Sequence, residues 1–157
     1  MTRTAVVEAW VEEPLKRFVD DARVRLALLL HPSGQVLAQH GFTRAVDVMS
    51  ACALAAAIHA SSGELGRQLE GKPFDGLHHG GKARQIFLAE AQTPRGPYIF
   101  LTVFDAESSL GLVQLYFGEF RQRLAAAAPP KEADRKVLAE NFEHDLNRNL
   151  ASLFGRA

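Results

Sequence analysis

The feature that most constrains this fold is a run of ten residues, Ala51–Ala60, that contains hardly a polar group. The run predicts a helix, because alanine loses almost no side-chain entropy when it becomes helical. A surface helix normally has one apolar stripe and one solvated face. This helix has hardly a polar group at its centre, so we expect it to be covered on more than one side.

The periodicity extends this helix from about Arg44 to about Leu69, with Thr43 as a cap. A helical wheel gives two stripes on opposite sides. We expect the first to face the protein's own core, and the second, made mostly of small residues, to contact another helix closely. The first stripe contains Ala51, Leu54, Ile58, Leu65 and Leu69, and the second contains Met49, Ala53, Ala56 and Ala60.

Composition limits the class of protein. The chain has 157 residues, 47% of them hydrophobic, with 18 basic and 18 acidic side chains and one cysteine. This length favours one domain, and zero net charge gives no basic surplus for nucleic acid. A single cysteine allows no internal disulfide. The N-terminus carries acids where a signal peptide needs an apolar core, and Ala51–Ala60 is about half of a bilayer span. We therefore expect a cytoplasmic protein.

The remaining segments predict a sheet between helices. A helix is expected over 13–22, with Pro14 in its first turn, and another after a cap at Ser108 or Ser109. The first 12 residues fit an arm, a strand or a kinked turn. Two strand segments are apolar on both faces, so the sheet must lie between helical layers. The predicted strands are 25–30, 35–40, 74–81, 83–91 and 98–104, with a hairpin turn at Gly34.

A tail follows the predicted domain. Residues 1–128 form the domain, and 129–157 form a Pro129-Pro130 linker and an amphipathic helix. This helix has two interpretations: it packs on its own domain, or it docks into a groove on a partner. Its apolar stripe contains Leu138, Phe142, Leu146, Leu150, Leu153 and Phe154.

Several strings resemble the roadblock/dynein light chain family over about residues 25–127. "LALLLHPSGQVLAQHG" is similar to the family's opening hairpin. "FDAESSLGLVQL", at 104–115, is similar to its last strand entering its last helix. Within the family, "GLHHGGKARQIFLAE" and the ending "NLASLFGRA" resemble the MglB group of bacterial regulators, which act on the Ras-like GTPase MglA.

The resemblance implies a three-layer α+β fold. A five-stranded antiparallel sheet would lie between the long helix and the terminal helices. The resemblance also implies a homodimer, in which edge strands pair and the two long helices lie side by side. The edge residues would be Phe74, Gly76, Leu77, His78 and His79.

The implied function is regulation of an MglA-like small GTPase in cell polarity or motility, without a cofactor or a catalytic residue. The regulator would activate hydrolysis, with modulation of nucleotide exchange as a further option. Tight binding without faster hydrolysis would instead indicate a scaffold, and a free-standing enzyme is the weakest alternative. The expected partner-binding residues are Met49, Ala53, Ala56, Ala57, Ala60, Arg67, Leu150, Leu153 and Phe154.

Other motifs give little support for catalysis or metal binding. Gly76–Lys82 matches most of a phosphate-binding loop, but Ala83 replaces the Ser or Thr that holds Mg²⁺, and the next segment is strand-like. His78 and His79 would point to opposite faces of a strand, so they do not share a metal.

The remaining candidates have simpler explanations. Cys52 and His59 are about 10 Å apart along a helix, too far for direct proton transfer. Asp105 and Glu107 are expected to cap the following helix. Three arginines are candidates for a finger on a GTPase, but the resemblance implies a regulator that reshapes its GTPase instead. They are Arg67, Arg84 and Arg95.

Overall fold

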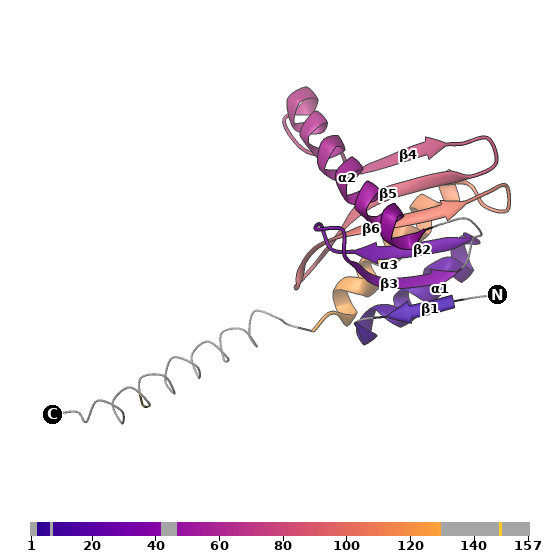
Figure 1. The fold of residues 1–157 in the computed structure, drawn as a ribbon. Coiled ribbons are helices and arrows are strands. Elements are labelled where there is room, and N and C mark those ends of the chain that lie inside the picture. The colour runs from indigo at the N-terminus through magenta and orange to yellow at the C-terminus, as the bar shows by residue number, and fades with distance from the viewer. Residues whose placement is uncertain (1–2, 7, 42–46, 130–147, 149–157) are drawn as a thin grey trace.

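The computed structural model describes residues 3–6, 8–41, 47–129 and 148. Six strands form one antiparallel sheet in the order β1-β3-β2-β6-β5-β4 (Figure 1). The strands are β1 (Arg3–Val6), β2 (Leu26–Leu30), β3 (Val36–Gly41), β4 (Gly76–Gly80), β5 (Gln85–Thr93) and β6 (Gly96–Phe104). The helices are η1 (Ala9–Val11), α1 (Glu12–Ala22), α2 (Val48–Glu70) and α3 (Leu110–Ala127).

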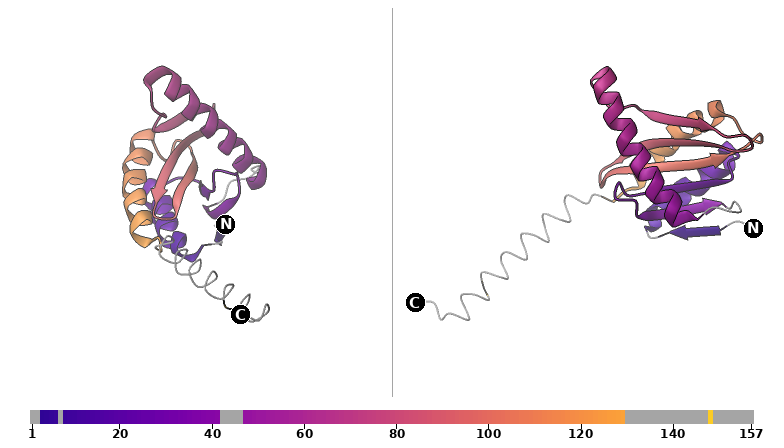
Figure 2. Two further views of the ribbon diagram at one scale, coloured as in Figure 1. Left: turned by 90° about the vertical axis from the view of Figure 1, so that its left-hand side faces the viewer. Right: turned by 45° about the horizontal axis from the view of Figure 1, so that its top comes forward.

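The five predicted strands are all present. The additional strand, β1, pairs with β3, so part of the N-terminal segment is a strand. Helices α1 and α3 cover one face of the sheet and α2 covers the other, which confirms the three layers (Figure 2). The tail interpretations lie outside the described residues, apart from Arg148.

The central strands are buried on both faces, as their apolar runs predict. All five residues of β2 are buried, and so are the last seven residues of β6. On the α1 and α3 face, Phe100 lies at the centre of an aromatic cluster. Its ring centroid is 4.8 Å from that of Phe18, 4.9 Å from that of Phe117 and 5.0 Å from that of Phe120. This cluster joins both helices to the sheet.

Local signals begin and end most elements as expected. Pro14 lies in the first turn of α1, and Gly34 turns the β2–β3 hairpin at a φ of 96°. Ser109 caps α3 by accepting a hydrogen bond from the Leu112 N–H. Thr43 lies outside the described residues, and α2 starts later than predicted. Asp47 is its N-cap, since its carboxylate accepts from the N–H groups of Met49 and Ser50.

The prediction for the core-facing side of α2 was wrong. Leu54, Leu65 and Leu69 are 64%, 51% and 68% exposed, and Ile58 is also exposed. The buried positions of the helix are instead Cys52, Ala55, Gly63 and Gly66. Cys52 and Ala55 pack on the sheet, and Gly63 and Gly66 pack on residues 72–74. The leucines lie to one side of this packed face and stay exposed.

The C-terminal half of α2 shows why small residues face inward. A Cβ on Gly66 would lie 2.5 Å from the backbone N of Phe74 and 2.8 Å from the Lys72 carbonyl oxygen. The chain therefore returns directly beneath the helix on its way to β4. Helix α2 runs obliquely over the sheet and reaches past β4 (Figure 1).

Helix α2 is longer than the apolar run 51–60, which by itself is too short to span a membrane. By length and composition, this 23-residue helix could cross a membrane. Two of its buried positions, Cys52 and Ala55, pack with Leu28, Leu30 and Leu101 in the hydrophobic cluster on the α2 face of the sheet, which we call the second core. The helix is therefore part of the core fold.

Candidate partner-binding surface

One side of α2 forms an exposed apolar surface, which we call the leucine flank: Leu54, Ile58, Leu65 and Leu69. Two hollows open beneath it. The first, of about 340 Å³, lies between Leu54 and Ile58 of the helix and Leu88 and Leu101 of the sheet. The second, of about 370 Å³, lies between α2 and the edge strand. Its lining includes Ala57, Ile58, Leu65, Phe74 and Leu77.

The other side of α2 carries the small side chains that the sequence singled out. We call Met49, Ala53 and Ala60 the small-residue flank; all three are exposed. Ala57 is exposed too, but it lines the second hollow together with Ile58 and Leu65 of the leucine flank. Ala56 differs from them, because it is half-buried and packs against the second core. Arg67 lies near the end of this flank, where its Nη1 is 3.3 Å from Glu64 Oε2.

Strand β4 lies at the edge of the sheet, where the dimer edge was predicted. Its residues are mostly exposed, and it pairs only with β5 among the described strands. Gly76 crosses closely over Phe87, since a Cβ there would lie 3.1 Å from the ring. The His78 Nε2 lies 2.7 Å from the Gln85 side-chain oxygen. One edge of β4 thus remains available for another strand.

The site residues predicted in the tail, Leu150, Leu153 and Phe154, lie outside the described residues. The remaining partner-binding predictions all lie on α2, and the edge predictions lie on or just before β4. The two sets meet at the second hollow, which is lined by Ala57 of the first set and by Phe74 and Leu77 of the second.

The α2 surface does not bring together a nucleophile and a base. Cys52 is buried, and this burial raises the pKa of its thiol. His59 instead contacts Glu90 on β5, where its Nε2 is 3.1 Å from Oε2. Sequence reasoning missed this pair, because Glu90 is 31 positions away and on another element.

The other chemical candidates also have structural roles. After β4 the chain turns into strand β5, whereas a phosphate-binding loop would open a helix. Within the described residues, no group of three or more metal-ligating side chains occurs. His78 and Gln85 are part of the edge hairpin rather than of a metal site.

Asp105 joins two strand ends near α3. The Arg25 Nε donates to Asp105 Oδ2 over 2.6 Å, and the Glu107 N–H donates to Oδ1 over 3.0 Å. These bonds, with the Arg25 side chain contributing most, hold the pKa of Asp105 below its ordinary value. The prediction that Asp105 and Glu107 cap α3 was wrong, because the cap is Ser109, as the other prediction has it. Asp105 instead fixes the preceding turn.

Protonation of Asp105 is therefore expected to reduce stability in acid. Its folded pKa is depressed, so its contribution is present above the unfolded pKa and lost as pH falls through the folded pKa. Asp105→Asn should lower the thermal midpoint at pH 7, and this deficit should shrink below about pH 4. Thermal unfolding at several pH values measures this deficit. Arg25→Gln should show the same deficit at pH 7 and the same decrease in acid. An equal deficit at pH 7 and pH 3 would contradict this role.

The sequence matches a family model described as the Roadblock/LC7 domain over residues 11–105. The fold is similar to that of Myxococcus xanthus MglB, with 25% identity and a TM-score of 0.66, over 74% of this chain and 92% of that one. It is also similar to the gliding protein MglB from Thermus thermophilus, with 25% identity and a TM-score of 0.68, over 79% of this chain and 92% of that one. No curated protein matches the sequence.

Proposed function

The chain belongs to the Roadblock/LC7 family, and on this premise we propose that it is a cytoplasmic homodimer that regulates an MglA-type Ras-like GTPase. The likeness to two MglB structures supports this choice within the family. The family is typically non-catalytic, which agrees with a regulator that supplies a surface rather than reactive groups. The implied role is control of cell polarity or motility.

The observation that carries the proposal is that α2 is exposed and apolar on two sides. Monomeric proteins rarely expose large contiguous apolar patches, and such patches often mark interaction sites. The leucine flank and the small-residue flank lie on different sides of one helix, so they can contact two different partners. We assign the leucine flank to a second copy and the small-residue flank to the GTPase.

A second copy fits the leucine flank for two reasons. The edge of β4 can pair with the β4 of another chain and extend the sheet. The second hollow lies between that strand and α2, so the same copy could bring its own α2 over the hollow. Zero net charge places no large repulsion between two identical chains.

The proposed regulation is allosteric. Binding favours the closed arrangement of the GTPase switch loops only if this protein contacts that arrangement more strongly than the open one. Arg67 is given no role as a finger, because it pairs with Glu64 on its own helix. Hydrolysis would then depend on the GTPase's own residues, with exchange as a second step that the tail could modulate.

GTP turnover tests the proposal. A purified MglA-type GTPase from the same organism is assayed alone and with increasing amounts of this protein. We expect acceleration that saturates near two chains per GTPase. Binding without acceleration would replace the activator with a scaffold, and the absence of binding would refute the proposed partner.

The leucine flank gives a separate prediction for self-association. Leu65→Ser is expected to weaken the dimer by about tenfold or more, because burying a leucine contributes about 1.5–3 kcal/mol. Sedimentation across a concentration series measures the change. The matched control is Leu115→Ser, since Leu115 on α3 is 59% exposed and lies on the opposite layer. Equal effects of the two variants would remove the leucine flank from the interface.

A further inference from the structure

His59 connects the middle of α2 to the sheet. Its Nε2 donates to Glu90 Oε2 on β5 over 3.1 Å, and the His59 side chain is half-buried. A carboxylate oxygen can only accept, so this nitrogen carries a hydrogen in either charge state of the ring. The pair links residues 31 positions apart and crosses from the helical layer to the strands.

Glu90 is held in place from a second side. The Gln92 side-chain amide donates to the other carboxylate oxygen, Oε1. Ile99 lies opposite Glu90 on β6, and Leu88 precedes it by two positions on β5. Glu90 is thus a polar position among apolar ones on the α2 face. A carboxylate fixed in this way gives the histidine a defined point of attachment.

The helix depends on such an attachment because its packing side is made of small residues. The buried positions of α2 are Cys52, Ala55, Gly63 and Gly66. These side chains remove little apolar surface from water, and hydrophobic stabilisation scales with the area removed. Two turns of helix separate Ala55 from Gly63, and His59 lies midway between them.

The two chain neighbours of His59 belong to the two different flanks of α2. Its neighbour Ile58 lines both hollows beneath the leucine flank. Its other neighbour, Ala60, belongs to the small-residue flank. A rotation or lift of α2 at this point would therefore change the two surfaces together.

We propose that the His59–Glu90 pair fixes the height and rotation of α2 on the sheet and so shapes the surface offered to the GTPase. The effect on the GTPase rests on the proposed function, whereas the anchoring of α2 does not. His59 is a positioning residue, since it acts through the placement of α2. The kind of partner surface that fits is an apolar one that tolerates close approach of a helix.

Amide hydrogen exchange and GTPase affinity test the proposal together. In His59→Ala and Glu90→Ala, the amides of residues 55–62 should exchange about fivefold faster, which is the effect of losing one hydrogen bond of ordinary strength. GTPase affinity should fall by about the same factor. The double variant should be no worse than either single one, because both remove the same interaction. His59→Gln, which keeps a donor, should restore most of both properties.

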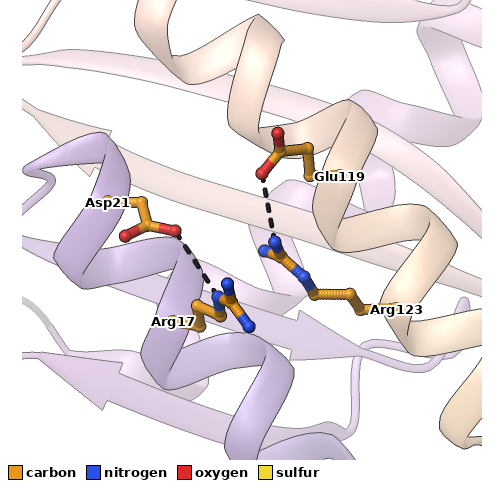
Figure 3. A network of polar contacts seen from close by, with 4 residues as sticks. All are labelled: Arg17, Asp21, Glu119 and Arg123. Atoms are coloured by element: carbon orange, nitrogen blue, oxygen red, sulfur yellow. Dashed lines mark hydrogen bonds and ion pairs between the residues drawn. The ribbon is translucent and has the colours of Figure 1, made fainter.

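The chain offers a matched ion pair as the control. The Arg123 Nη2 lies 3.2 Å from Glu119 Oε2 on α3, and the similar Arg17–Asp21 pair lies on the neighbouring helix α1 (Figure 3). Arg123→Ala should leave both the exchange of 55–62 and the GTPase affinity unchanged.

Three outcomes would overturn parts of the proposal separately. Unchanged exchange, or effects that add in the double variant, would show that the pair does not anchor α2. Faster exchange with unchanged affinity would show an anchor without influence on the partner surface. If the unmodified protein binds no MglA-type GTPase, the proposed function fails, while the exchange measurements still decide the anchoring.

Discussion

Ala60→Arg is expected to lower affinity for the GTPase by at least about a hundredfold and to abolish activation. Ala60 is exposed in the middle of α2 on the small-residue flank, so the isolated fold has room for an arginine. In the complex, the long side chain would separate surfaces that approach closely, and its charge would lose water without a partner. Calorimetric titration and GTP turnover measure the two losses.

The control for Ala60→Arg is Ala126→Arg. Ala126 is also an exposed alanine in a helix, but it lies near the end of α3 on the other layer. Ala126→Arg should leave GTPase affinity and GTP turnover unchanged. Ala56 is a poorer test position, because it is half-buried against the second core and an arginine there would disturb the fold itself. Unchanged affinity in Ala60→Arg would assign the GTPase to another surface.

Phe100→Ala is expected to lower the free energy of unfolding by about 3–5 kcal/mol. Phe100 is fully buried, and its ring touches those of three other phenylalanines from α1 and α3. Removing it leaves a cavity between the sheet and both helices. Because a domain of this kind is stable by only about 5–15 kcal/mol, this change is a large fraction of the total.

Urea unfolding followed by circular dichroism measures this loss. All variants are compared at one protein concentration, since self-association raises apparent stability by mass action. Phe100→Leu keeps most of the volume and should cost much less. A loss below about 1 kcal/mol in Phe100→Ala would show that the helices repack over the sheet, contrary to a well-packed core.

The local signals in the sequence were sufficient for most elements. Apolar runs bounded by turn residues located the strands, and Pro14, Gly34 and Ser109 marked a helix start, a hairpin and a cap. These signals act within a few residues, so they are readable without the rest of the chain. Two central strands that are apolar on both faces also required a sheet between helical layers.

The orientation of α2 could not be read in the same way. The wheel correctly separated a stripe of large residues from stripes of small ones, but it placed the large residues inward. The assumption was that the most apolar side faces the core. In the structure, Gly63 and Gly66 face inward because the chain returns beneath them. This close approach is between α2 and the segment 72–74 that follows it, and the periodicity of the helix alone contains no information about where that segment lies.

The amino-acid order alone was enough for the layers and the two apolar stripes of α2, because short-range periodicity and turn chemistry encode them. The family followed from the resemblance of several strings to its members. Folding in three dimensions settled that most of both stripes of α2 stays exposed, where β1 paired, and that His59 reaches Glu90. These features depend on distances between residues far apart in the chain. Close packing fixes such distances, and local propensity carries no information about them.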